Sequence, residues 1–326
     1  MLSFADIKGQ TNAIKYLTRC LAAGRVSSSY LFTGPDGVGR SSCARAFIRA
    51  IMCPGKPEEA RACDVCPTCR RVEALEHPDV LWIKPEKGKA IKIEEVRQAR
   101  EKLNLKPFEA VSSVCVIEDA HLLTVSAANA LLKILEEPPG GSMLILITDK
   151  KELLPRTVVS RCSEVRFFSL PIPVAKEVIS SKLDGTGESE LSFLAGFSQG
   201  SPGKALEIAR TGVVARREDV MRLLKDIAAG ENVWCMNWDV EDKLQMAEDI
   251  ELVLMLVRDT ALVVSGAESR MTDTALSAGE LMSMFGKSSP DKLYALMARL
   301  VNVRRALMGN ANPKIAAQVL PGMVKG

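Results

Sequence analysis

Aromatic residues are scarce in this chain of 326 residues, and long apolar runs are missing. Phe, Trp and Tyr make up 5% of the sequence, and only two histidines occur. A transmembrane helix needs about 18 consecutive apolar residues. The longest apolar-rich stretch, Leu252–Val264, is interrupted by Arg258 and Asp259, so no membrane span is expected. The N-terminus lacks the basic start and apolar core of a signal peptide, and a cytoplasmic protein is expected.

An excess of charge of one sign is also missing. The net charge is +3, from 43 basic and 40 acidic residues. A dedicated nucleic-acid binder is usually much more basic, so any contact with nucleic acid is expected to be local. The composition, 47% hydrophobic and 25% charged, is that of a globular protein. Two or three domains are expected at this length.

An apolar run, a glycine-rich turn and a helix follow one another near the N-terminus. Ser29–Phe32 is a predicted buried strand, and Ser41–Arg49 is a predicted helix. Between them, Gly34 and Gly39 have the spacing of the phosphate-binding motif G-x-x-x-x-G-K-[ST]. Glycines let backbone N–H groups surround phosphate oxygens, and the start of a helix adds positive charge. This stretch therefore predicts a phosphate loop.

The loop departs from the motif at Arg40, which stands where lysine is expected. Lysine is a compact point charge, whereas a guanidinium is a broad planar fork. The predicted degenerate site includes Gly37 and Ser41 beside the two motif glycines. Binding of ATP or ADP with Mg²⁺ at this loop stays open.

Four of the nine cysteines are clustered. Cys53, Cys63, Cys66 and Cys69 have the spacing C-x9-C-x2-C-x2-C. Four thiolates complete the tetrahedral coordination of Zn²⁺ and leave no open position, so a structural zinc site is predicted. A thioredoxin-like C-x-x-C motif and a disulfide framework are the alternatives; the overlapping spacing disfavours the first, and a reducing compartment disfavours the second.

An acidic pair follows the predicted strand 110–117. Glu118 and Asp119 stand at the carboxyl end of this strand, downstream of the phosphate loop. This arrangement indicates the Mg²⁺-associated acidic site of a nucleotide-binding α/β fold. Thr148, which ends the next predicted strand, is assigned to the same degenerate site. His121 is assigned a positional role.

Apolar runs alternate with helical patterns up to residue 170. The predicted strands are 29–32, 80–83, 110–117, 142–148 and 165–168. Such alternation predicts a parallel sheet covered by helices on both faces. From Pro171 onward the pattern is helical only.

At this point the motifs resemble a known family. The phosphate loop, the four cysteines, Ser126–Pro139, Ser160-Arg161-Cys162 and Asn310-x-Asn312-Pro313 occur in the order found in bacterial DNA polymerase III clamp-loader AAA+ subunits. The resemblance implies an α/β P-loop AAA+ domain (1–170) with a zinc module (53–69). A small helical lid (171–212) and an all-α collar (213–326) that joins the subunits would follow.

The resembled family contains an ATP-hydrolysing gamma/tau type and a largely non-hydrolysing delta-prime type. Arg40 replaces the lysine, and Glu118-Asp119 reverses the Asp-Glu order of hydrolysing members. Gly203 stands where the lid arginine that senses the γ-phosphate is expected. No long C-terminal extension is expected after the third predicted domain. These departures favour the delta-prime type, with little or no ATP hydrolysis of its own.

The resemblance also assigns a role to Arg161. In this family the arginine of Ser-Arg-Cys is an arginine finger, which stabilises transition-state charge in the nucleotide site of a neighbouring subunit. The implied partners are the delta and gamma/tau subunits in a hetero-pentamer, the sliding clamp, and primer–template DNA through the assembled complex. The complex belongs to the DNA polymerase III holoenzyme.

Two other functions stay open at this stage. The chain is an ATP-hydrolysing gamma/tau-type subunit if its isolated form sustains turnover. It is a zinc-dependent or thiol-redox protein on an AAA+ scaffold if its cysteines form disulfide pairs without zinc. Trp234 and Trp238 are expected to pack in a core rather than to stack on bases.

Overall fold

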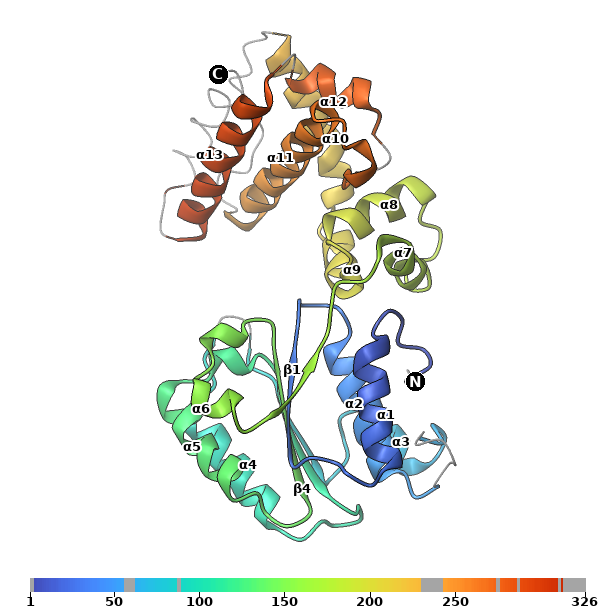
Figure 1. Cartoon of the computed structure of the whole chain (residues 1–326), viewed down its shortest axis with the longest axis vertical. Helices are drawn as coiled ribbons and strands as arrows, with labels where there is room; N and C mark the ends of the chain where they lie inside the picture. Colours follow the sequence, from blue (N-terminus) through green and yellow to red (C-terminus); the bar gives the residue numbers. More distant parts are fainter. Residues whose placement is uncertain are drawn as a thin grey trace. The chain divides into compact units, whose positions relative to one another are not determined.

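A five-stranded parallel sheet forms the centre of the N-terminal part of the computed structural model (Figure 1). Its strand order is β2-β3-β4-β1-β5. The strands are β1 (Ser29–Thr33), β2 (Val80–Ile83), β3 (Ser113–Ile117), β4 (Ser142–Thr148) and β5 (Ser163–Arg166). Because all neighbours run in the same direction, every strand ends at the same edge of the sheet. The loops that carry the predicted nucleotide site follow these ends.

The structure describes residues 3–55, 62–86, 89–229, 243–273, 276–285, 288–309 and 312. Trp234, Trp238 and most of the Asn310–Pro313 motif lie outside this range. The chain divides into two compact units, Met1–Val174 and Ala175–Gly326.

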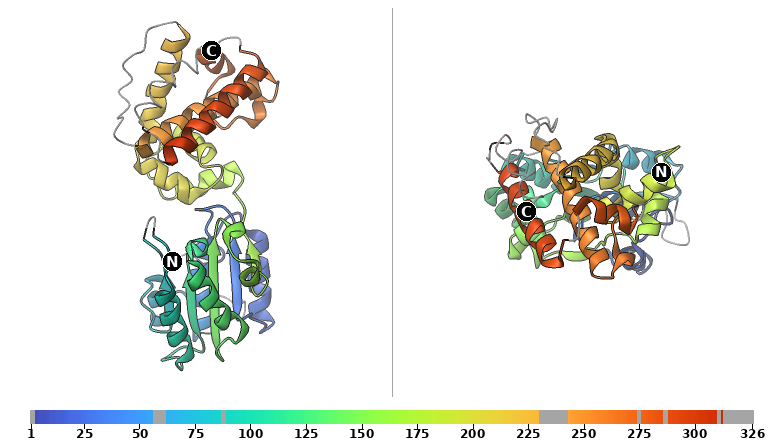
Figure 2. Two further views of the ribbon diagram at one scale, coloured as in Figure 1. Left: turned by 90° about the vertical axis from the view of Figure 1, so that its left-hand side faces the viewer. Right: turned by 90° about the horizontal axis from the view of Figure 1, so that it is seen from above.

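Helices cover both faces of the sheet, as Figures 1 and 2 show. Helices α1, α2 and α3 lie on one side, and α4, α5 and α6 lie on the other. The helices of the first unit are α1 (Thr11–Ala22), α2 (Arg40–Met52), α3 (Pro67–Glu73), α4 (Ile93–Asn104), η1 (Ala120–Leu122), α5 (Val125–Glu136), η2 (Lys151–Leu153) and α6 (Arg156–Val159). The predicted α/β architecture with a two-sided parallel sheet is confirmed.

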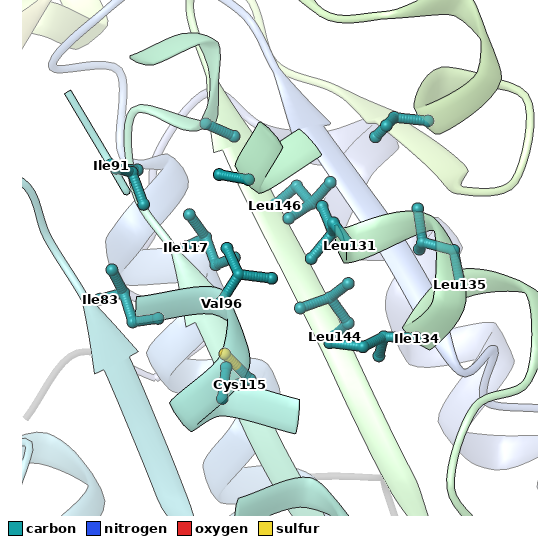
Figure 3. Packing of buried hydrophobic residues seen from close by; sticks show 14 of the residues in the cluster. Ile83, Ile91, Val96, Cys115, Ile117, Leu131, Ile134, Leu135, Leu144 and Leu146 are labelled. Atoms are coloured by element: carbon teal, nitrogen blue, oxygen red, sulfur yellow. The ribbon is translucent and has the colours of Figure 1, made fainter. Parts of the chain in front are cut away.

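A cluster of buried apolar residues packs between the sheet and helices α4 and α5 (Figure 3). Every residue of β1 and β3 is buried, which fits continuous apolar runs in a sheet covered on both faces. Ile117 of β3 and Leu146 of β4 contribute to the same cluster as Val96 of α4 and Leu131 of α5. Close packing of this kind holds the ends of the strands in fixed positions, and the loops of the predicted nucleotide site follow these ends.

Two strand boundaries differ from the sequence prediction because side chains take over backbone hydrogen bonds. β3 begins at Ser113 rather than at residue 110, since the Ala110 N–H donates to the Asp79 carboxylate. β5 spans Ser163–Arg166 rather than 165–168. The backbone N–H of Phe168 donates to Gln10 Oε1, and its C=O accepts from Gln10 Nε2. The side chain of Gln10 thus takes the place of a neighbouring strand at Phe168.

The second unit is helical in the residues that the structure describes, as predicted. Its helices are α8 (Glu188–Phe197), α9 (Pro202–Arg210), α10 (Val213–Ala228), α11 (Lys243–Val264), η3 (Glu268–Arg270), α12 (Ala278–Phe285) and α13 (Pro290–Met308), and α7 (Ile172–Ser180) crosses the division between units. Among the described helices none is long and apolar enough to cross a membrane. The division into lid and collar stays a prediction.

Candidate nucleotide and metal sites

The glycine-rich loop connects β1 to α2 with a backbone that requires glycine. Gly34, Gly37 and Gly39 have φ angles of +143°, +73° and +100°. A Cβ atom on Gly34 would lie 2.3 Å from the carbonyl oxygen of Phe167, so a side chain does not fit there. The loop therefore has the turn that the motif predicts, and α2 begins directly after Gly39.

Arg40 lies at the first position of α2 with its side chain turned inward. It is 5% exposed, and its Nη2 donates to Asp36 Oδ1 at 3.1 Å. Its Nη1 is buried and has no hydrogen-bond partner. A buried donor without a partner is costly. This N–H group is therefore available to an anion.

Arg40 lines a pocket of about 340 Å³ at the edge where the strands end. Both signs of charge meet in it, and Lys84 pairs with Glu118 at 3.3 Å. The pocket is lined by Asp36, Arg40, Ser41, Arg45, Leu75, Trp82, Lys84, Glu118, Asp119 and Ile147. A polar pocket beside a phosphate loop can accept a phosphorylated ligand.

Asp119 has an unusual backbone and a perturbed carboxyl group. Its φ angle of +48° is in the left-handed region, which non-glycine residues rarely adopt. Burial raises the pKa of Asp119; His121 opposes this shift, and Glu118 adds to it. This partly buried carboxylate would be stabilised by a nearby cation or by a proton.

Thr148 lies at the same edge, because β4 is the neighbour of both β1 and β3. It pairs with Thr33, the residue before Gly34. The Thr148 hydroxyl is buried, lies 3.1 Å from His121 Nδ1 and accepts the Lys150 N–H at 3.0 Å. The structure therefore brings all the residues of the predicted degenerate site to one edge of the sheet, and nucleotide binding there stays a prediction.

Arg45, Trp82, Lys84 and Asp149 at this edge were not predicted from the sequence. Arg45 lies one helical turn after Ser41, so helical spacing from the loop would have found it. Lys84 and Asp149 directly follow β2 and β4. Glu118 directly follows β3 in the same way, so the position after a parallel strand is the signal that identifies Lys84 and Asp149.

The four clustered cysteines are brought together by the ends of two helices. Cys53 follows α2, Cys66 caps the start of α3, and Cys69 lies in the first turn of α3. The sulfur atoms of these residues and Cys63 all lie within 4.8 Å of one another. Sulfurs around one zinc ion at 2.3 Å would be separated by about 3.8 Å. The cluster can therefore hold a metal ion.

Backbone hydrogen bonds in the cluster favour negatively charged sulfur. The Cys63 N–H donates to Cys53 Sγ at 3.3 Å, and the Cys69 N–H donates to Cys66 Sγ at 3.4 Å. Backbone N–H groups of Val65 and Cys66 lower the pKa of Cys63 to about 6. Burial raises the pKa of the Cys53 thiol. A bound cation would keep all four as thiolates.

Arg161 lies at the surface, in the turn after α6. Its side chain is 38% exposed; it pairs with Glu136 at 2.8 Å and donates to the Thr157 carbonyl at 3.0 Å. Glu136 is itself half exposed, so the pair is weak and readily exchanged. Arg161 is thus available to a partner. Gly203 lies in the first turn of α9, in the second unit.

A phosphate loop between β1 and α2, acidic residues at the ends of neighbouring parallel strands and helices on both faces define the first unit. It is a P-loop α/β domain of the nucleotide-binding class.

Comparison with known proteins identifies the family. The profile described as "DNA polymerase III, delta subunit" matches residues 9–171, which is half of the chain. DNA polymerase III subunit delta' of Escherichia coli (strain K12) is 30% identical over 288 residues, covering 88% of this chain and 84% of that protein. The delta' subunit of Bacillus subtilis (strain 168) is 26% identical, covering 80% of each chain.

DNA polymerase III subunit tau of Bacillus subtilis (strain 168) is 29% identical over 227 residues, covering 67% of this chain. The chain spans about 40% of the length of that tau subunit. The chain belongs to the DNA polymerase III clamp-loader family, and the predicted AAA+ α/β fold is confirmed.

Proposed function

We propose that this chain is the delta-prime-type subunit of a DNA polymerase III clamp loader and hydrolyses little or no ATP itself. The observation that carries the proposal is the side chain of Arg40, which is buried and paired with Asp36 at 3.1 Å. A phosphate-loop lysine would extend toward the phosphates, whereas this guanidinium is held beside the loop. The match to delta' subunits over most of both chains supports the same assignment.

In this proposal, Arg161 serves the nucleotide of a neighbouring subunit. Its exposure and its weak pairing with Glu136 support this role. The chain would assemble through its collar with delta and gamma/tau subunits in a cytoplasmic hetero-pentamer. That complex would place the sliding clamp on primer–template DNA with energy from ATP. The proposal also includes a small helical lid at residues 171–212 and a helical collar at residues 213–326.

The cysteine cluster is proposed to hold a structural Zn²⁺. Four sulfur ligands leave no coordination position for water or substrate, so the metal would stabilise the module without taking part in catalysis. Metal analysis together with thiol titration tests this proposal. Two disulfide pairs without zinc would instead support the thiol-redox function.

The role of Arg161 is tested by Arg161→Ala in the reconstituted loader. Removal of an arginine finger lowers hydrolysis at the site it serves by about 10³-fold or more. We therefore expect lower ATPase activity, stimulated by DNA and clamp, with ATP binding and assembly retained. Arg97→Ala, which removes an exposed arginine of α4, is the matched control and should have no effect.

Unchanged ATP turnover with Arg161→Ala would contradict the arginine-finger role. Nucleotide binding and steady-state hydrolysis by the isolated chain test the other half of the proposal. Sustained turnover would identify an ATP-hydrolysing gamma/tau-type subunit instead.

A further inference from the structure

Arg49 is a buried cation in the last turn of α2, close to the cysteine cluster. Its side chain is 0% exposed, whereas arginine is almost never fully buried unless it is paired. Taking a guanidinium out of water is costly, and its ion pairs must offset this cost. Neither the phosphate loop nor the proposed arginine finger uses this residue. Its burial is therefore explained by what it contacts.

Arg49 contacts each of the three segments that carry the clustered cysteines. Its backbone carbonyl accepts the N–H of Cys53 at 2.9 Å, at the end of α2. Its Nε forms an ion pair at 3.3 Å with Oδ1 of Asp64, which lies in the turn between the second and third cysteines of the cluster. Its Nη1 donates to Oε2 of Glu73, the last residue of the helix that carries the fourth cysteine. One residue thus joins all the segments that supply sulfur ligands.

Through Asp64 the ion pair also constrains a sulfur ligand. The φ angle of Asp64 is +57°, in the left-handed region that non-glycine residues rarely adopt. In this conformation its backbone N–H donates to the sulfur of Cys69 and lowers the pKa of that thiol, against burial, which raises it. The guanidinium of Arg49 holds the carboxylate of Asp64, and so keeps the N–H of the same residue directed at the sulfur.

The charge of Arg49 balances the acidic groups of the module. Asp64 and Glu73 are 29% and 27% exposed, so solvent screens their charges only in part. Four thiolates around one Zn²⁺ carry a net negative charge, which two neighbouring carboxylates would increase. A guanidinium between the carboxylates offsets this repulsion.

We propose that Arg49 is a positioning residue for the structural zinc ion. It holds the Asp64 turn and the end of α3 so that the four sulfurs keep the spacing that Zn²⁺ requires. This inference rests on the proposed zinc site. Groups that orient metal ligands without touching the metal change the metal affinity by about 10- to 100-fold when they are removed. The phosphate-loop helix, and not the cysteines alone, therefore sets the affinity for zinc.

The experiment measures the zinc affinity of the full chain by competition with a chelator, and records the visible spectra of the same proteins loaded with Co²⁺. The absorption bands of Co²⁺ bound to thiolates depend on the arrangement of the ligands, so they report geometry independently of affinity. We expect Arg49→Met to bind zinc at least about tenfold more weakly and to change the Co²⁺ bands. Arg49→Lys keeps the charge but lacks the planar fork that pairs with both carboxylates, so it should restore the affinity only in part.

Asp79→Asn is the matched control for loss of stability. The Asp79 carboxylate accepts the N–H of Phe108, outside the cysteine cluster, so this variant weakens the first unit without touching the module. It should bind zinc with wild-type affinity and show unchanged Co²⁺ bands. Equal losses of affinity in Asp79→Asn and Arg49→Met would overturn the proposal, because zinc affinity would then follow general stability. Full restoration by Arg49→Lys would also overturn it, because charge alone would then suffice.

Should Arg49→Met fail to fold, Asp64→Asn and Glu73→Gln decide. Each removes the charge of one partner that is partly exposed, and asparagine tolerates the left-handed conformation. Both are expected to weaken zinc binding and to change the Co²⁺ bands. Wild-type affinity and bands in these variants would overturn the role of Arg49 and leave the zinc site standing. A wild-type chain that binds neither ion would overturn the zinc site itself, and this inference with it.

Discussion

At the phosphate loop, arginine stands where the motif has lysine, and this exchange changes how the site can bind a phosphate. Arg40 has the charge of the expected lysine, yet its Nη2 is committed to Asp36 and only Nη1 is left without a partner. The guanidinium is planar and rigid, so Nη2 cannot turn toward a phosphate without leaving Asp36, and Nη1 is the donor that a phosphate would meet. Any nucleotide bound at this loop would therefore depend on the position of this one side chain.

Arg40→Lys tests this dependence. We expect tighter ATP binding, by about tenfold, because the flexible ammonium reaches phosphates as a point charge. We expect no hydrolysis by the variant, since Glu118 and Asp119 keep their reversed order. Isothermal titration and steady-state ATPase measurements on the isolated chain check both expectations. Equal or weaker binding by the lysine variant would show that Arg40 does not limit affinity.

Residues whose roles depend on local spacing could be predicted from the sequence. The four cysteines are close in the chain, so their spacing alone indicated the cluster that the structure contains. His121 and Asp149 are 28 positions apart, and only the pairing of β3 with β4 brings them together. Without that register, His121 was assigned no more than a positional role.

In the segment before β3, the buried carboxylate of Asp79 determines where the strand begins. Asp79 accepts N–H groups from Phe108, Glu109 and Ala110 at 2.6, 2.9 and 2.9 Å. These bonds hold a tight turn and delay the start of the strand. Burial opposes ionisation, but the three N–H donors lower the pKa of Asp79 below its ordinary value of 3.8.

Asp79→Asn should destabilise the fold in a pH-dependent way. Hydrogen bonds to a charged group contribute about 1.5–3 kcal/mol each, and an amide replaces them in part, so we expect a loss of about 2 kcal/mol at pH 7. Since the folded pKa is depressed, this stabilisation is present above the ordinary value and is lost as pH falls through the folded value. Urea unfolding at pH 3 to 7 should show the two proteins converging in acid.

The control for this series is Asp219→Asn, because Asp219 is 71% exposed and its pair with Arg222 contributes little. It should match the wild type at each pH. A constant difference between Asp79→Asn and the wild type down to pH 3 would contradict the role of the ionised carboxylate.

The order of strands and helices could be predicted because buried parallel strands are continuous apolar runs. Their ends could not, since Gln10 and Asp79 are distant in sequence from the backbone groups that they bind. Apolar periodicity carries no information on such partners. The boundary errors at β3 and β5 both have this cause.

For the whole molecule, the cysteine cluster should decide whether the first unit is stable. Without the metal, the thiolates would be buried with no cation to compensate their charge. The turn between α2 and α3 would then no longer be held by its sulfur ligands. We expect one zinc per chain, and after its removal a loss of at least about 3 kcal/mol, which lowers the melting temperature by roughly 10 °C. Mass spectrometry and thermal unfolding by circular dichroism measure the two quantities.

Cys69→Ser should reproduce the effect of metal removal, whereas Cys20→Ser, outside the cluster, should retain zinc and stability. A metal-free chain with an unchanged melting temperature would contradict a structural role. The partners of the complete protein could be predicted only through its resemblance to a family, because no local pattern in the chain specifies them.

Arg49, at the end of the phosphate-loop helix, makes the stability of the first unit relevant to the amount of this protein in a cell. Its side chain is fully buried between Asp64, which lies between the clustered cysteines, and Glu73, which ends the helix α3 that carries Cys69. Loss of that segment would leave a cation without partners inside the protein, a state that folded chains do not tolerate. Unfolded chains are removed by proteases. The copy number of this protein should therefore follow the zinc supply of the cell.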